Sequence, residues 1–204
     1  ELALRIARSA TGRKGVIVAD YAYHGNTQAI YEITTSEIPA EDLPGYVVAV
    51  PAPDTYRGRY RDGDAAAKYA AHVHDAIALL ESRGFEPAAF VIDTIASSCG
   101  VVEPPRGYLA AVAAIVRDAG ALFIADEVQP GFGRTGRNFW GFEADGLVPD
   151  IVTMGKPMGN GHPLAGVVAK REVTEAFAMS GRYFNTFGGS PVSAAAGLAV
   201  LEVI

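Results

Sequence analysis

Short apolar runs alternate along the chain with longer amphipathic stretches. The runs are five to seven residues long and rich in β-branched residues, which predicts buried β-strands. In the amphipathic stretches, apolar residues recur every three or four positions, which predicts helices with one apolar face. The predicted strands are 14–20, 88–92, 121–125, 151–155 and 164–169, and the predicted helices are 1–10, 26–32, 64–83, 106–119 and 193–204.

The spacing of these elements predicts how the strands pair. The helix at 106–119 is followed at once by the strand at 121–125, and strand–helix–strand units with such short connections need parallel strands and a right-handed crossover. Only seven residues, 157–163, separate the last two predicted strands, which is too few for a crossover helix. The sequence therefore predicts an α/β fold with a mostly parallel sheet and one antiparallel strand.

Composition limits the class of protein. The chain has 204 residues, of which 50% are hydrophobic and 20% charged, so it can bury a core and lacks the signature of disorder. A net charge of −6 disfavours nucleic-acid binding. The single Cys99 excludes an internal disulfide framework and fits a reducing compartment. Arg117 and Asp118 interrupt the longest candidate for a membrane span, and no signal peptide opens the sequence, so we expect a cytoplasmic protein.

Both ends of the sequence lie inside predicted helices. Residues 1–10 have a helical pattern with no capping residue before it, and residues 193–204 stop without a C-terminal cap. We therefore expect residues 1–204 to be the central domain of a longer protein.

An acid and an amine follow two of the buried runs. Asp126 and Glu127 come directly after the strand at 121–125, and Lys156 follows the strand at 151–155. Open α/β sheets bind ligands beyond the carboxyl ends of their strands. Asp126 and Glu127 are adjacent, so on a strand only one of them can face that crevice. A carboxylate and an amine in one crevice suit pyridoxal phosphate, which has a basic ring nitrogen and a reactive aldehyde.

Two other motifs are weaker candidates for function. Residues 131–136 read G-x-G-x-x-G, but an aromatic segment broken by glycine follows, so we expect no helix to carry a dinucleotide pyrophosphate. His72 and His74 are two apart on a predicted helix and point to different sides, so they do not form a metal-binding pair.

Three segments resemble the signature sequences of the class III pyridoxal-phosphate aminotransferases: ADEVQPGFGRTG at 125–136, PDIVTMGKPMGNGHP at 149–163 and NTFGGSPVSAAAGLAVLEVI at 185–204. DTYRGRYR at 54–61 and GKPMGNGHP at 155–163 resemble the phospho-lyase branch of that family. The resemblance implies the large domain of a fold type I pyridoxal-phosphate enzyme, with three αβα layers. The segment that binds the cofactor phosphate and a small C-terminal domain would then lie outside residues 1–204.

The resemblance also implies roles around the cofactor ring. Tyr23 would stack on one face of the pyridine ring and Val128 would pack on the other. Asp126 would bind the ring nitrogen, and Gln129 would lie near the phenolic oxygen. Lys156 would hold the aldehyde as a Schiff base and act as the catalytic residue.

Two further cofactor-binding residues come from the resemblance alone. His24 would lie beside the ring, next to Tyr23. Thr186 would reach the cofactor phosphate of the neighbouring subunit, which implies a homodimer with shared active sites.

Two places leave the interpretation open. The family usually has a glutamate where this chain has Asp93, and the loop at 97–100 lacks the usual glycine pair.

Arg57, Arg59 and Arg61 lie in a long, mostly irregular stretch at 34–61, which has one brief apolar run at 46–50. On an extended segment the three arginines would share one face and could bind a substrate phosphate. The alternative is a solvated loop whose arginines pair with Asp54, Asp62 and Asp64.

Three functions follow from these observations. The resemblance favours a lyase that eliminates phosphate from a small phospho-amine such as phosphoethanolamine, giving an aldehyde, ammonia and phosphate. The alternative is an ω-aminotransferase that moves an amino group from an amine or ω-amino acid to pyruvate or glyoxylate. A third possibility is a non-catalytic scaffold, which Asp93 favours and the intact Asp126, Gln129 and Lys156 disfavour.

Overall fold

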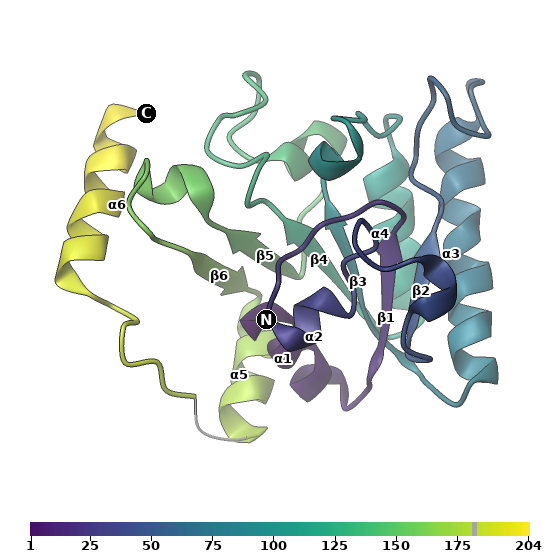
Figure 1. The fold of residues 1–204 in the computed structure, drawn as a ribbon, viewed down its shortest axis with the longest axis horizontal. Helices are drawn as coiled ribbons and strands as arrows, with labels where there is room; N and C mark the ends of the chain where they lie inside the picture. The colour runs from purple at the N-terminus through teal and green to yellow at the C-terminus, as the bar shows by residue number, and fades with distance from the viewer. Residues whose placement is uncertain (181–182) are drawn as a thin grey trace.

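The computed structural model describes residues 1–180 and 183–204. These residues form one six-stranded sheet with helices on both faces (Figure 1). The strand order is β2-β1-β3-β4-β5-β6. The strands are β1 (Gly15–Ala19), β2 (Val47–Val50), β3 (Pro87–Asp93), β4 (Leu122–Asp126), β5 (Ile151–Met154) and β6 (Gly166–Ala169). The α-helices are α1 (Leu2–Thr11), α2 (Gln28–Tyr31), α3 (Ala65–Ser82), α4 (Tyr108–Asp118), α5 (Arg171–Ser180) and α6 (Pro191–Val203).

Strand pairing follows the predicted pattern. Neighbouring strands from β2 to β5 are parallel, and β5 pairs with β6 antiparallel. The connection between β5 and β6 holds only the short 3-10 helix η4 (Lys156–Gly159), so the chain reverses without a crossover. The predicted α/β fold with a mostly parallel sheet and one antiparallel strand is therefore confirmed.

The central strands are buried on both faces. All seven residues of β3 are buried, and alternate side chains enter different layers: Phe90 and Ile92 join the core under α3 and α4, whereas Ala89 and Val91 join the core under α1 and α5. A strand covered on both faces reads as a continuous apolar run, which is why the sequence pattern locates it well. Two helix layers and one sheet make the three-layer architecture.

Helix α6 lies outside these layers (Figure 1). It packs on the connection between β5 and β6 at Gly197, where an added Cβ would lie 2.7 Å from Leu164. Most of its apolar side chains are exposed, including Leu198 and Leu201. Its 13 residues span about 20 Å, short of the roughly 30 Å of a bilayer core. Throughout the described part of the chain, no helix is both long and apolar enough to span a membrane.

Some local expectations were wrong or incomplete. The apolar run at 46–50, inside a stretch expected to be mostly irregular, forms β2, an edge strand parallel to β1. Helix α5 was not predicted: its overall hydrophobicity is low, and only Val173 on it is fully buried. Residues 55–57 form a turn and not an extended segment, because Asp54 accepts hydrogen bonds from the backbone N–H groups of Tyr56 (2.7 Å) and Arg57 (3.0 Å).

A buried aspartate ties helix α4 to the sheet. Asp150 accepts hydrogen bonds from Arg117 Nε (3.0 Å to Oδ2) and from the Phe123 backbone N–H (2.9 Å), and its Oδ1 lies 2.6 Å from Lys170 Nζ. Burial alone would raise the pKa of Asp150, but the hydrogen bonds from Arg117 and Lys170 outweigh it and hold the pKa below its ordinary value. The ionised form is therefore favoured in the folded protein.

We expect Asp150→Asn to lower the free energy of unfolding of the full-length protein by about 2 kcal/mol at neutral pH, because it breaks a buried charged cluster. A pKa lowered by folding adds stability above the unfolded value, near 3.9, and this stability is lost as pH falls through the folded value. The difference between wild type and variant should therefore narrow below about pH 4. Urea unfolding at a series of pH values measures it. Asp118→Asn, an exposed change on the same helix, is the control, and equal effects of the two variants would contradict the prediction.

Candidate active site

A row of polar side chains lies at the carboxyl edge of the sheet. In the register of the parallel strands, Asp93 at the end of β3 pairs with Asp126 at the end of β4, and Asp126 pairs with Thr153 on β5. Side chains at paired positions emerge on the same face of a sheet. The fold therefore gathers two carboxylates and a hydroxyl at the edge where α/β folds bind their ligands.

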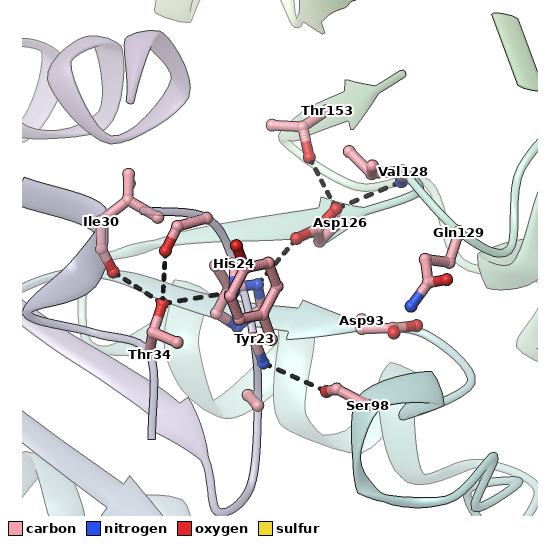
Figure 2. Close-up of polar contacts among 12 residues, drawn as sticks. Tyr23, His24, Ile30, Thr34, Asp93, Ser98, Asp126, Val128, Gln129 and Thr153 are labelled. Carbon is pink, nitrogen blue, oxygen red and sulfur yellow. Dashed lines mark hydrogen bonds and ion pairs between the residues drawn. The ribbon is translucent and has the colours of Figure 1, made fainter. Parts of the chain in front are cut away.

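Asp126 is held from both sides (Figure 2). Its Oδ2 lies 2.7 Å from Nδ1 of His24, which comes from the loop after β1. Its Oδ1 accepts hydrogen bonds from the Val128 backbone N–H (3.1 Å) and from Thr153 Oγ1 (3.2 Å). The residue is only 8% exposed, so these contacts fix the direction in which its carboxylate points.

His24 is fixed in turn by the segment after β1. Its side chain is 3% exposed, and its backbone N–H donates to the hydroxyl of the fully buried Thr34 (3.4 Å). The neighbouring Thr35 hydroxyl accepts from the Ala22 N–H (2.8 Å) and donates to the Ala19 carbonyl (2.7 Å). Within the described residues, Nε2 of His24 is buried and has no hydrogen-bond partner. The imidazole thus contacts Asp126 through Nδ1 alone.

Glu127 points away from this edge, as expected for the neighbour of Asp126 on a strand. It is fully buried, and its carboxylate accepts hydrogen bonds from Thr94 Oγ1 (2.6 Å) and from the backbone N–H groups of Gly141 (2.8 Å) and Phe142 (3.1 Å). Burial raises the pKa of Glu127, while these hydrogen bonds act in the opposite sense. Glu127 therefore fastens the 131–141 loop to the fold, and of these two adjacent acids only Asp126 faces the edge.

Lys156 begins η4 directly after β5 and Gly155. Its backbone lies in the left-handed region at φ 35°, which is strained for a residue with a side chain. The side chain is exposed and lines two hollows beside the sheet edge. The larger hollow, of about 1450 Å³, also has Thr94, Ser97, Val128 and Gln129 in its wall. The smaller hollow, of about 590 Å³, shares Val128 and adds Met154, His162 and Leu164.

The loop after β3 connects Asp93 to two other segments. Asp93 accepts hydrogen bonds from the backbone N–H groups of Ile95 (3.1 Å) and Ser97 (2.9 Å) and from the Ser97 hydroxyl. The Gln129 amide nitrogen donates to Ser97 Oγ at 2.5 Å. Ser98 Oγ accepts from the backbone N–H of Tyr23 at 3.1 Å. Asp93 is therefore used within its own loop and lines neither hollow.

The wall of the larger hollow has four basic and three acidic side chains, and two of the acids are engaged by backbone N–H groups. Glu143 accepts from the Trp140 N–H (2.9 Å), and Asp145 accepts from the N–H groups at the start of α4 (2.8 and 2.9 Å), so both acids serve as backbone caps. No ion pair of the described residues involves the arginines there. The charged residues of the wall are Glu103, Arg106, Arg134, Arg137, Glu143, Asp145 and Lys156.

Some predicted site residues lie elsewhere. Arg57, Arg59 and Arg61 are exposed on the turn after β2 and line neither hollow. The expected pairing of these arginines with Asp54, Asp62 and Asp64 was also wrong, since Arg61 instead donates to the carbonyls of Gly58 (3.0 Å) and Arg57 (3.2 Å). Thr186 is exposed in the loop before α6 and lines neither hollow.

The weaker motifs have structural roles. After the G-x-G-x-x-G loop at 131–136, the chain reaches only the five-residue 3-10 helix η3 (Gly141–Asp145), so no α-helix starts there. His72 contacts the hydroxyl of Tyr60 at 3.2 Å from α3. In the part of the chain that the structure describes, no cluster of histidine, cysteine and acidic side chains could hold a metal ion.

Three residues of the site were not expected from the sequence. Thr34, Thr153 and Ser97 hold His24, Asp126 and Gln129 respectively. The only sequence signal was position: Thr153 lies three residues before Lys156 on a predicted strand, and Ser97 lies four residues after Asp93 in a loop. The partners of these hydroxyls come from other segments, which spacing alone does not reveal.

The donors at this edge fit pyridoxal phosphate. Asp126 offers a fixed carboxylate, Lys156 a primary amine beside a hollow, and Gln129 an amide in the same wall. Tyr23 is 44% exposed and provides a flat aromatic face in the loop before His24 (Figure 2). These are the groups that a cofactor with a ring nitrogen, a phenolic oxygen and an aldehyde requires.

The chain is similar to known aminotransferases and phospho-lyases. The chain is 44% identical over 213 residues to an alanine–glyoxylate aminotransferase 2-like protein of Drosophila melanogaster, covering 100% of the chain and 43% of that protein. It is 40% identical over 220 residues to ethanolamine-phosphate phospho-lyase homolog 1 of Caenorhabditis elegans, covering 100% of the chain and 47% of that protein. The structure of a phospholyase from Arthrobacter in complex with phosphoethanolamine matches with a TM-score of 0.91 and 46% identity, over 99% of this chain and 48% of that one.

The chain thus spans about half the length of the relatives it matches. The aminotransferase class-III family profile matches residues 1–204. Its mostly parallel sheet with one antiparallel strand is that of fold type I pyridoxal-phosphate enzymes. The chain therefore belongs to the class III aminotransferase family.

Proposed function

We propose that the carboxyl edge of β1, β4 and β5 binds pyridoxal phosphate, with Asp126 at the ring nitrogen and Lys156 at the aldehyde carbon. Tyr23 and Val128 cover the two faces of the ring, and Gln129 contacts its phenolic oxygen. The observation that carries this proposal is the fixed Asp126 carboxylate at the strand end next to the one that carries Lys156. When bound, the protonated cofactor accepts the electron pair left by a proton that departs from the substrate.

The residues of this chain have distinct tasks in that chemistry. The charge of Asp126 keeps the ring nitrogen protonated, and His24 and Thr153 keep the carboxylate aimed at it. The amine of Lys156 would hold the aldehyde carbon of the cofactor and, once free, would accept the proton from the substrate carbon that bears nitrogen. The arginines of the larger hollow suit an anionic substrate, whether a phosphate ester or a carboxylate.

We expect His24→Ala to weaken pyridoxal phosphate binding to the full-length protein by about 10- to 100-fold, because Asp126 loses a charge-assisted hydrogen bond. Equilibrium dialysis or fluorescence titration of the cofactor measures it. His74→Ala, which removes an exposed histidine of α3, is the matched control. If the two variants bind the cofactor equally well, His24 does not hold Asp126 in its binding geometry.

For the overall reaction, we propose elimination of phosphate from a small phospho-amine such as phosphoethanolamine. With water, phosphoethanolamine yields an aldehyde, ammonia and phosphate. This proposal is supported by the likeness to the Arthrobacter phospholyase and to the Caenorhabditis elegans phospho-lyase homolog. The alternative, supported by the Drosophila melanogaster relative, is transfer of the amino group from an amine or ω-amino acid to pyruvate or glyoxylate.

An assay without a keto acid separates the two reactions. We expect the full-length enzyme to release phosphate from phosphoethanolamine over many turnovers, and Lys156→Ala to reduce the rate by at least about 10³-fold. Lys68→Ala removes a half-buried lysine of α3 that pairs with Asp62 and lines neither hollow, so it should keep the wild-type rate. A single equivalent of aminated cofactor without phosphate release would support the aminotransferase.

We also propose a homodimer in which Thr186 reaches the cofactor phosphate of the partner. Thr186 lies between Phe184 and Phe187, which are 83% and 86% exposed. Together with the exposed apolar side chains of α6, these rings form the kind of surface that another protein chain covers.

A further inference from the structure

The loop after β3 has two adjacent serines that contact different strand ends. Ser97 contacts Gln129, in the segment after β4, and Ser98 contacts the backbone of Tyr21 and Tyr23, in the segment after β1. In the proposed cofactor site, Gln129 and Tyr23 touch the ring at different places. The serine pair therefore joins two cofactor-facing segments that the sheet itself does not connect at this edge.

The single proton of the Ser97 hydroxyl determines how the Gln129 amide is oriented. A serine hydroxyl has one proton, and a carboxylate only accepts hydrogen bonds. The Ser97 proton is donated to Asp93, so its oxygen can only accept from Gln129. The Gln129 side chain must then present its nitrogen to Ser97, and Figure 2 shows this nitrogen on the side of Asp93. An amide nitrogen carries two protons, so the second remains free to donate to a ligand in the hollow.

Ser98 works through the backbone. Its oxygen accepts from the Tyr23 N–H at 3.1 Å, and its hydroxyl donates to the Tyr21 carbonyl at 3.1 Å. Tyr21 lies in the left-handed region at φ 60°, a conformation that a turn of non-glycine residues adopts only when other contacts hold it. Ser98 is such a contact. By holding the backbone at Tyr21 and Tyr23, it fixes the position from which the Tyr23 side chain extends.

We propose that Ser97 and Ser98 are positioning residues: Ser97, anchored by Asp93, turns an N–H of Gln129 toward the phenolic oxygen of the cofactor, and Ser98 holds the segment that carries Tyr23. This inference rests on the proposed cofactor site. In this proposal Asp93 orients Ser97 within the loop, and Asp93 itself does not contact the substrate.

The pH midpoint of the absorbance change of bound pyridoxal phosphate tests Ser97 in the full-length protein. An N–H donated to the phenolic oxygen stabilises its negative charge, and therefore favours the form of the bound cofactor that has lost its proton. Ser97→Ala should raise the midpoint by about half to one pH unit, the effect of one lost hydrogen bond. Ser97→Thr keeps the hydroxyl and should keep the midpoint.

A double-mutant cycle assigns the effect to Gln129. Gln129→Ala should raise the midpoint as Ser97→Ala does, and the double variant should show no further rise. An unchanged midpoint in Ser97→Ala, or additive shifts in the double variant, would overturn the proposal for Ser97. Should Ser97→Ala not fold, Asp93→Asn is the second variant: it frees the Ser97 proton and should move the midpoint in the same direction.

Ser98 has a separate readout. Ser98→Ala should weaken cofactor binding about three- to tenfold, since it loosens the backbone under Tyr23, and should leave the midpoint unchanged. Ser82→Ala, an exposed serine at the end of α3, should change neither quantity. Unchanged cofactor binding in Ser98→Ala would remove Ser98 from the proposal. Failure of the proposed function would look different: wild-type protein would then show no cofactor absorbance that depends on Lys156.

Discussion

Two carboxylates side by side on neighbouring strands are the constraint around which this edge is built. The parallel register places Asp93 and Asp126 opposite each other, and neighbouring strands are only about 4.8 Å apart. Like charges directly opposite destabilise a sheet unless each finds its own partners. Here the partners differ: Asp93 is bound by its own loop, and Asp126 by a histidine and a threonine from other segments. One acid becomes part of a turn, while the other stays at the edge where a ligand can bind.

The two carboxylates find these partners in the segments that follow the strands. The turn after β1 carries Thr34 and His24, and the turn after β3 carries the serine pair. In each turn some polar groups bind within their own segment, as Thr34 and Asp93 do, and others reach a neighbouring strand end, as His24, Ser97 and Ser98 do. The two helix layers make this possible because they keep both faces of the sheet apolar and leave the carboxyl ends as the open side. Architecture and site are thus linked through the loops.

The elements that could be predicted from the sequence are those whose burial gives them a regular pattern of apolar residues. The central strands read clearly because both faces are apolar, whereas β2 was missed because it is a four-residue edge strand inside a stretch with several prolines. Asp126 and Lys156 were located by their position after apolar runs. The contact between Asp126 and His24, 102 residues apart, depends on the order of strands in the sheet, which a single sequence does not encode locally. The prediction that the arginines at 57–61 share one face of an extended segment was wrong for a local reason. The Asp54 carboxylate accepts hydrogen bonds from two backbone N–H groups and so folds the segment into a turn.

The backbone of Lys156 has a consequence for how this position tolerates change. At φ 35° a side chain costs about 1 kcal/mol or more, and glycine, which has no Cβ, would escape that cost. Conformational preference alone would therefore select glycine here, as it does at so many tight turns. Lys156 therefore occupies a position where the backbone conformation favours glycine. A library of variants at position 156 that is ranked only by the yield of folded protein would favour glycine and discard the amine on which the proposed chemistry depends.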